Sequence, residues 1–296
     1  MTRVVAPNDV RTPVSETSEV ETLIAATETL KPIAAWPLAG VAIVLIALAA
    51  VFLEAGTLNV DGFLAVQVFT RGTPDSLWAM LTICGTGVVA FALLSPTLAW
   101  QPRWFAAALA AAALAGLYSN GIKRVFALPR PASVLDPSRL HVIGETLHAN
   151  SFPSGHAVTA FTLAALLVLA SRKPLRTALW AVPFAVLIAF SRIAVGAHWP
   201  ADIAAGAAGG WVCGAIGVVL VARWRFWNST LGVRVMGVIA IGIGASLFVV
   251  DLGYPLALPL QDVAGVIAIA SGIAAIARPR LDRLLPAVAG SRASRD

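Results

Sequence analysis

Residues 191–222 read SRIAVGAHWPADIAAGAAGGWVCGAIGVVLVA and join a short polar segment to a long apolar run. The apolar part, 203–222, is long enough to cross a bilayer as a helix, which takes about 20 residues at about 1.5 Å each. The polar part places an arginine, a histidine and an aspartate directly before that run. This arrangement predicts a membrane-spanning helix with reactive groups near one membrane surface.

The composition of the whole chain supports a membrane protein. Hydrophobic residues make up 58% of the 296 residues and charged residues only 12%, with a mean hydropathy of +0.84. Such values do not suit a water-soluble surface. We therefore predict an all-α, multi-pass membrane protein whose helices follow the apolar runs at about 34–53, 76–99, 104–121, 155–171, 177–191, 203–222, 233–251 and 257–277.

The basic residues predict the orientation of the chain. If the runs alternate in direction, fifteen of the 21 lysines and arginines fall on one side of the membrane. Basic residues accumulate on the cytoplasmic side, so both termini are expected in the cytoplasm and the polar segments outside it. The same rule explains the net charge of +6, which therefore does not indicate nucleic-acid binding. The other side holds Arg71, Lys123, Arg124, Arg130, Arg139 and Arg192.

The runs also suggest how the chain is organised. We expect a cytoplasmic tail, a main membrane domain, an extra pair of membrane helices and a basic cytoplasmic tail, at 1–33, 34–222, 223–277 and 278–296. Two isolated cysteines inside apolar runs match neither a metal site nor a disulfide framework, so core packing is expected for Cys84 and Cys213. Gly206, Gly210 and Gly214 recur every four residues, which predicts close helix packing within the chain.

The first of three polar blocks is KRVFALPRP, residues 123–131. Pro129 and Pro131 prevent the helix from continuing through Arg130, which is therefore presented from an extended segment. An arginine can direct two hydrogen bonds at a phosphate, and Lys123 adds a point charge. By itself, however, a basic pair at the end of a membrane helix usually serves as an interfacial anchor.

The second block is PSGH, residues 153–156. Pro153 suits the start of a helix, and Ser154 and Gly155 bring backbone N–H groups with little side-chain bulk to that start. Unpaired N–H groups and the helix dipole favour an anion there. His156 follows at once, where it can give a proton to a leaving oxygen. A single histidine at a helix end is otherwise more often an interfacial residue.

The third block contains His198 and Asp202. Pro200 suits the first turn of the next helix, so His198 is expected just before that helix and Asp202 can fold back toward it. A carboxylate on one imidazole nitrogen leaves the other nitrogen free to attack. The competing interpretation, an aspartate that only caps its helix, stays open at this point.

KRVFALPRP, PSGH and SRIAVGAHWPAD resemble, in order and internal spacing, the three-part signature of the type 2 phosphatidic acid phosphatase (PAP2) superfamily. The resemblance covers roughly residues 123–202 and implies a six-helix membrane core with two additional C-terminal helices. It implies that His198 is a nucleophile that forms a phosphohistidine, that Asp202 orients it and that His156 protonates the leaving group. It implies phosphate binding by Lys123, Arg130, Ser154, Gly155 and Arg192, without a metal or other cofactor.

The resemblance further implies a lipid phosphatase of the bacterial cytoplasmic membrane, with its site on the outer face. Undecaprenyl diphosphate ranks first among substrates, followed by phosphatidylglycerol phosphate, phosphatidate and lipid A. A lipid-linked phosphotransferase would share the phosphohistidine step and stays open, as does a homo-oligomer. A vanadate haloperoxidase of the same superfamily is disfavoured by the apolar runs, and a transporter by charges that gather at one surface.

Two features lie outside the signature. The loop at 132–152 can cover a headgroup and bring Arg139, His141, Glu145 or His148 near it, although an ordinary solvated role is expected for each. Asp251 and Asp262 fall at the ends of the extra C-terminal runs, where we expect polar residues of no catalytic role. The task of these two runs is left open between buttressing, dimerisation and shaping a lipid entrance.

Overall fold

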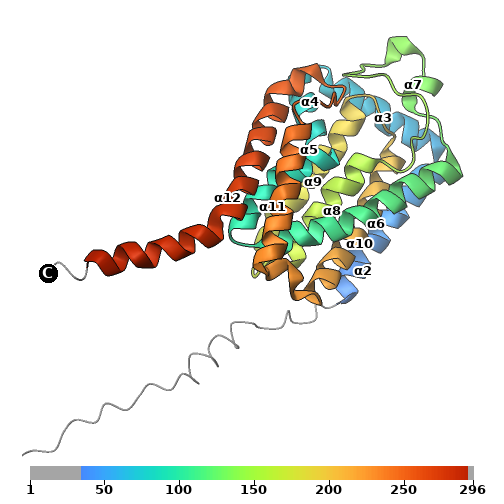
Figure 1. Cartoon of the computed structure of the whole chain (residues 1–296). Helices are drawn as coiled ribbons and strands as arrows, with labels where there is room; N and C mark the ends of the chain where they lie inside the picture. Colours follow the sequence, from blue (N-terminus) through green and yellow to red (C-terminus); the bar gives the residue numbers. More distant parts are fainter. Residues whose placement is uncertain (1–34, 293–296) are drawn as a thin grey trace, which may run out of the picture. The chain divides into compact units, whose positions relative to one another are not determined.

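The computed structural model describes residues 35–292, which form helices and connecting loops without a β-strand in that range (Figure 1). The predicted tail at 1–33 and the last four residues lie outside the described part. In chain order the α-helices are α2 (Ala35–Glu54), α3 (Gly56–Thr70), α4 (Asp75–Ile83), α5 (Gly87–Leu94), α6 (Pro102–Phe126), α7 (Pro131–Val134), α8 (Gly155–Leu169), α9 (Pro174–Ala194), α10 (Pro200–Ala222), α11 (Thr230–Ser246) and α12 (Leu258–Arg292). Short 3-10 turns are η1 (Ser95–Ala99), η2 (Pro137–Arg139), η3 (Arg225–Asn228) and η4 (Pro255–Ala257).

Every predicted apolar run contains a helix, but the run at 76–99 is broken. Its two halves, Asp75–Ile83 and Gly87–Ala99, are bent by 76°. The break contains Gly85, where a Cβ would lie 2.8 Å from Ile188 Cγ2 and 2.9 Å from His156 Cβ. Only a glycine lets the turn approach α8 and α9 so closely, and hydropathy alone does not reveal that approach.

Helix α3 was not predicted. Its sequence, GTLNVDGFLAVQVFT, is interrupted by polar residues, so it does not form an apolar run. Phe63, Gln67 and Thr70 are nevertheless buried on one face, at helical spacing. Gln67 donates to the carbonyls of Ile193 and Ala194 at 2.8 and 3.0 Å, which ties α3 to the end of α9.

The structure contains fewer full-length spans than the eight predicted runs. Within residues 35–292, four helical segments are long and apolar enough to cross a membrane: Pro102–Val134, Pro174–Ala194, Pro200–Ala222 and Pro255–Ala277. The number rises to six if the bent pairs α2–α3 and α4–α5 each count as one span. Helices α8 and α11 have 15 and 17 residues. At about 1.5 Å per residue they fall short of a core about 30 Å thick.

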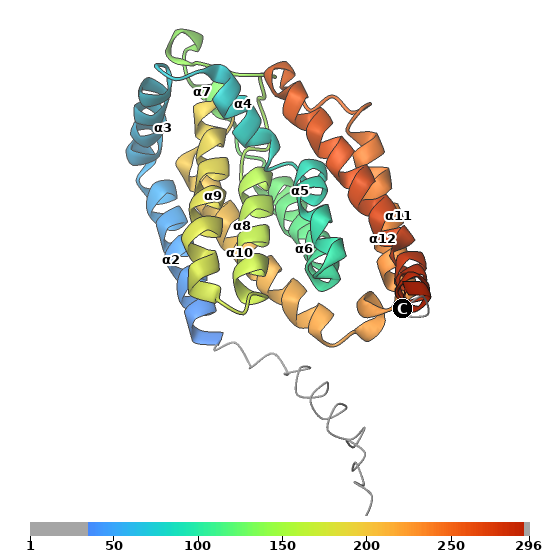
Figure 2. The same cartoon turned by 90° about the vertical axis from the view of Figure 1, so that its left-hand side faces the viewer.

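Helix α8 packs against α6, α9 and α10 (Figures 1 and 2). The closest approach follows the glycines of α10, since a Cβ on Gly206 would lie 2.6 Å from the Ser154 carbonyl oxygen. Cβ atoms on Gly210 and Gly214 would collide with the carbonyl oxygens of Val158 and Thr162. The predicted intramolecular role of these glycines is confirmed. Cys84 and Cys213 are buried free thiols, as expected.

The C-terminal helices α11 and α12 form an antiparallel pair beside α5 and η1 (Figure 2). They approach each other closely at Gly237 and Gly272, where added Cβ atoms would meet the opposite backbone. Of the three tasks left open by the sequence, this placement corresponds to buttressing. Helix α12 continues to Arg292, into the segment predicted as a basic tail. Asp251 and Asp262 are exposed at the ends of the pair, as expected.

Candidate active site

The three polar blocks meet at one end of the helices. Helices α6 and α9 end there, and α8 and α10 begin there. Contacts of His198 show this: its Nε2 atom is 3.2 Å from Arg130 Nη1, and its backbone N–H donates to the Arg192 carbonyl at 3.2 Å. Burial, followed by the charges of Arg130, Arg192, Lys123 and His156, lowers the pKa of His198 well below its usual value near 6.5. The fold therefore brings together residues between 123 and 202 that α7, α8 and α9 separate in the sequence.

His198 lies in the short loop between α9 and α10 and is 2% exposed. Its Nδ1 atom is 3.1 Å from Asp202 Oδ2. Helix α10 begins at Pro200, as predicted, and the Trp199 N–H donates to the same Asp202 oxygen at 2.9 Å. Asp202 thus caps its helix and contacts the imidazole at once, so capping is not its only role.

Arg130 lies opposite the other nitrogen of the same ring. It occupies an extended segment directly before α7, as predicted, and its Nη1 atom is 3.2 Å from His198 Nε2. Backbone carbonyls of Ala149 and Ala197 accept from its Nε and Nη1 at 2.7 and 3.0 Å. A guanidinium can only donate, so Nε2 must accept and the imidazole proton is on Nδ1, facing Asp202. His198 is therefore held neutral, with its Nε2 lone pair directed at a cation.

Arg192 belongs to the last turn of α9 and is 2% exposed. Its Nη1 atom donates to Thr82 Oγ1 and Tyr254 Oη, both at 2.6 Å. Its Nε atom is buried and has no hydrogen-bond partner among the described residues. A buried donor of a charged group without a partner is unusual and fits an anion-binding position.

The start of α8 supplies neutral donors. Ser154, rather than Pro153, precedes the first helical residue, and its hydroxyl accepts from the Ala157 N–H at 3.4 Å. The Ser154 N–H donates to the Asp202 carbonyl at 3.0 Å, which joins this helix start to the His198 loop. A Cβ on Gly155 would lie 4.0 Å from Lys123 Nζ, so the lysine lies beside the helix start. Helix dipole and lysine charge thus act on the same point.

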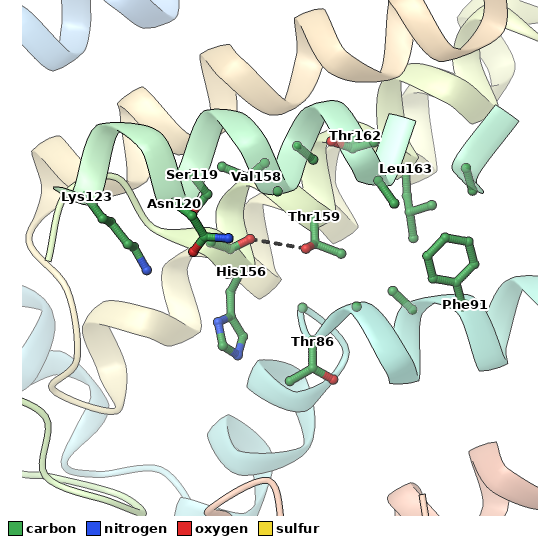
Figure 3. A pocket seen from close by; sticks show the side chains of 18 residues that line it. Thr86, Phe91, Ser119, Asn120, Lys123, His156, Val158, Thr159, Thr162 and Leu163 are labelled. Carbon is green, nitrogen blue, oxygen red and sulfur yellow. Dashed lines mark hydrogen bonds between the residues drawn. The ribbon is translucent and has the colours of Figure 1, made fainter. Parts of the chain in front are cut away.

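His156 stands on the first turn of α8, with its Nε2 atom buried and without a partner among residues 35–292. Together with Lys123 it borders a cavity of about 370 Å³ between α5, α6 and α8 (Figure 3). The two residues lie at one end of this cavity, and Phe91 and Leu163 lie at the other. Small residues line much of the rest, among them Ala90, Ala108, Ala112, Ala115 and Gly116. The reactive end of the site therefore opens into a mostly apolar space.

The loop at 132–152 crosses this end without directing its charged side chains into the site. His141 Nε2 is 2.8 Å from Asp75 Oδ1, and the Arg139 carbonyl accepts from Arg71. His148 uses its carbonyl to accept from the Arg130 N–H at 3.0 Å. These solvated or structural roles agree with the expectation for this loop, and Glu145, like the others, does not line the cavity.

The structure adds Ser151, Thr82 and Tyr254 to the residues predicted from the sequence. Ser151 Oγ donates to Asp202 Oδ2 at 2.5 Å, and Thr82 and Tyr254 hold Arg192. Ser151 stands only two residues before Pro153, and its nearness to the PSGH block was the single available signal. Thr82 lies in the apolar run at 76–99 and Tyr254 lies between the last two runs, and nothing in the sequence links either residue to Arg192.

Comparisons with known proteins agree with the geometry. Residues 104–228 match the sequence model of the PAP2 superfamily, and all eight predicted site residues fall within this stretch. A curated relative, the undecaprenyl-diphosphatase of Sulfolobus acidocaldarius, is 39% identical over 93 residues. This match covers 30% of the present chain and only 42% of the relative's length. The crystal structure of Aquifex aeolicus LpxE matches with a TM-score of 0.48 and 29% identity, over 55% of this chain and 95% of that one.

The matched stretch contains the three cations Lys123, Arg130 and Arg192, together with the start of α8 and the His198–Asp202 pair. Metal binding has no obvious place in it, since no group of three or more His, Cys, Asp or Glu residues within the described part of the chain is arranged to hold an ion. The expectation that no metal is used stays a prediction. Over residues 104–228, the stretch that contains the predicted site, this chain is similar to the PAP2 superfamily.

Proposed function

We propose that the protein is a membrane lipid phosphatase that removes the terminal phosphate of a lipid phosphate or diphosphate, with undecaprenyl diphosphate as the preferred substrate. The observation that carries this proposal is His198, held neutral between Asp202 and Arg130 beside a partnerless Arg192 Nε. A neutral imidazole can act as a nucleophile, and the arginines beside it can bind the phosphoryl oxygens. The name of the Sulfolobus relative supports the choice of substrate.

In the first half-reaction, His198 Nε2 attacks phosphorus, and an N–P bond forms as the bond to the leaving oxygen breaks. His156 gives its proton to that oxygen. Lys123, Arg130, Arg192 and the α8 start balance the charge that spreads over the phosphoryl oxygens. In the second half-reaction, His156 takes a proton from water, water oxygen bonds to phosphorus, and the N–P bond breaks to restore His198.

The apolar cavity supports a lipid substrate. It begins at Lys123 and His156 and extends along the small residues of α5, α6 and α8 (Figure 3). A prenyl or acyl chain can occupy such a space while the phosphate stays at the polar end. We place the protein in the bacterial cytoplasmic membrane, with both termini in the cytoplasm and the site on the outer face.

The decisive experiment is phosphate release by the purified protein in detergent with EDTA present. Undecaprenyl diphosphate, phosphatidate, phosphatidylglycerol phosphate and lipid A would be compared for wild type, His198→Ala and His148→Ala. We expect release from undecaprenyl diphosphate that His198→Ala abolishes and that His148→Ala, an exposed loop histidine, leaves intact. Retention of most of the rate by His198→Ala would contradict the phosphohistidine step. Release that appears only when a lipid acceptor is added would identify a phosphotransferase instead.

A further inference from the structure

The contacts of Arg192 connect the site to the C-terminal helix pair. Its buried Nη1 atom donates to two neutral oxygens, Thr82 Oγ1 from α4 and Tyr254 Oη from the turn between α11 and α12, both at 2.6 Å. The Tyr254 ring centroid is 5.9 Å from Arg192 Cζ, so the aromatic ring also attracts the cation. The segment that connects the C-terminal helices lies outside the residues matched by the family model. It therefore contacts Arg192, a residue predicted to bind phosphate, directly.

Tyr254 is firmly held at this position. Its side chain packs with the buried cluster formed by residues of α4, the end of α9 and the α11–α12 turn, including Ile83, Ala194 and Leu247. The loop at 132–152 covers the ring at Gly144, where a Cβ would lie 2.7 Å from Tyr254 Cε1. Gly144 has φ of +84°, in the left-handed region that favours glycine. The hydroxyl is thus directed at Arg192 from a packed support.

The chemistry of this contact differs from that of an ion pair. Among the described residues, no carboxylate forms a salt bridge with Arg192. Two hydroxyl acceptors on Nη1 restrain the guanidinium without neutralising it, and Nε remains without a partner. A guanidinium restrained on one nitrogen keeps its fork in a fixed plane for a phosphoryl group.

We propose that Tyr254 is a positioning residue that orients Arg192 for the phosphoryl group, and that supplying it is a task of the C-terminal helix pair. The inference rests on the proposed function, because it presumes that Arg192 binds phosphate. It gives the pair a role in the reaction as well as in buttressing α5.

The test compares two single variants, Tyr254→Phe and Tyr118→Phe, each of which removes the hydroxyl of one of the two tyrosines in the chain. Tyr118 Oη donates to the Ala205 carbonyl at 2.9 Å and does not contact Arg192. Tyr254→Phe is expected to lower kcat/KM for undecaprenyl diphosphate by about tenfold to a hundredfold, which is the typical worth of a hydrogen bond from a charged group. Most of the loss should fall on kcat, because the contact matters most as charge develops. Tyr118→Phe should leave kcat/KM unchanged.

A double-mutant cycle separates orientation of Arg192 from a general structural effect. If Tyr254 acts through Arg192, then Tyr254→Phe in an Arg192→Ala background should change kcat/KM by less than about twofold. The same loss in both backgrounds would overturn the proposal. Melting temperatures in detergent, measured for all variants, identify any loss that comes from unfolding.

Binding of orthovanadate, which mimics the pentacoordinate phosphorus in the transition state of phosphoryl transfer, provides a readout independent of lipid turnover. Tyr254→Phe should bind it about tenfold or more weakly than wild type, and equal affinity would overturn the positioning role alone. If wild type binds orthovanadate but hydrolyses no tested lipid, the proposed function fails and the affinity ratio still decides the role of Tyr254. If wild type does neither, both proposals are overturned.

Discussion

At the residue scale, the site depends on the contacts of the two ring nitrogens of His198. Asp202 accepts from Nδ1 and Arg130 donates toward Nε2, at 3.1 and 3.2 Å. The carboxylate fixes the tautomer, and the guanidinium lies beside the free lone pair. In the proposed reaction, attack on phosphorus requires that Arg130 pass its hydrogen bond from Nε2 to a phosphoryl oxygen, so the same cation would serve the resting state and the reaction.

Ser151 makes a prediction at this scale. Its hydroxyl donates to the Asp202 oxygen that also contacts His198 and Trp199. Ser151→Ala removes a hydrogen bond to a charged group, worth about 1.5–3 kcal/mol. We expect kcat to fall by about tenfold to a hundredfold, measured as phosphate release. Ser246→Ala, which removes a hydroxyl bonded to its own helix at the Ile243 carbonyl, is the control and should retain the wild-type rate.

The pH dependence follows from the lowered pKa of His198. Burial and the charges of Arg130, Arg192 and Lys123 disfavour the imidazolium, so the nucleophile remains neutral below pH 6.5. As the pH falls, activity should therefore persist below pH 6.5 and decline only at the lower pH at which His198 becomes protonated. Removing a nearby cation stabilises the imidazolium and raises the pKa of His198. Lys123→Gln is thus expected to move the acidic limb of kcat/KM to higher pH.

The measurement is the pH profile of kcat/KM for wild type and Lys123→Gln, whatever their absolute rates. Lys173→Gln, an exposed lysine beside the opposite end of α9, provides the matched control and should leave the limb in place. An acidic limb that stays fixed, or moves to lower pH, in Lys123→Gln would contradict the electrostatic argument.

At the element scale, the approach of α10 to α8 sets the geometry of the site. Gly206 lies against the Ser154 carbonyl, and Gly210 lies against the Val158 carbonyl. Because neither glycine carries a side chain, the start of α8 lies close enough for the Ser154 N–H to donate to the Asp202 carbonyl at 3.0 Å. The close packing at these glycines therefore determines the distance between the start of α8, which we propose to bind phosphate, and the His198 loop.

Gly210→Ala tests this packing. The added methyl group would collide with the Val158 backbone, which cannot move as a side chain can. We expect a loss of about 1–3 kcal/mol, observed as a lower melting temperature in detergent. Gly242→Ala is the matched control, because nothing lies within 4 Å of its added Cβ. Equal melting temperatures for the two variants would contradict the proposed role of the stripe.

At the scale of the whole molecule, all the proposed reactive groups lie at one end of the helices. Exposed basic residues lie at the other end: Arg172 and Lys173 between α8 and α9, and Arg176 in the first turn of α9. This separation of site and basic loops is the physical basis for the proposed orientation, with the site outside the cytoplasm.

Orientation can be measured by cysteine labelling in cells whose outer layers have been removed and whose cytoplasmic membrane is intact. The native thiols of Cys84 and Cys213 are buried, so wild type serves as an unlabelled control. An impermeant maleimide should label Asp136→Cys, which is exposed at the site end, without permeabilisation. It should label Lys173→Cys only after permeabilisation. The reverse pattern would place the site in the cytoplasm.

Much of the fold could be predicted from the sequence, because helices in a membrane must be apolar along their length. Each predicted run contains a helix, while α3 and the break at Gly85 were missed. Both exceptions depend on contacts with distant residues: Gln67 with the end of α9, and Gly85 with His156. Hydropathy is a local property and carries no record of such contacts.

The helical membrane class and the candidate residues could be predicted from the amino-acid sequence, since length, hydropathy and motif spacing are local properties. Proline placement likewise determined that Arg130 is extended and that α10 begins at Pro200. Two hydrogen bonds could be found only from the tertiary structure: Ser151 donates to Asp202, and Arg192 donates to Tyr254. Residues 192 and 254 are brought together by the packing of separate helices, and no local pattern encodes which hydroxyl a buried guanidinium will find.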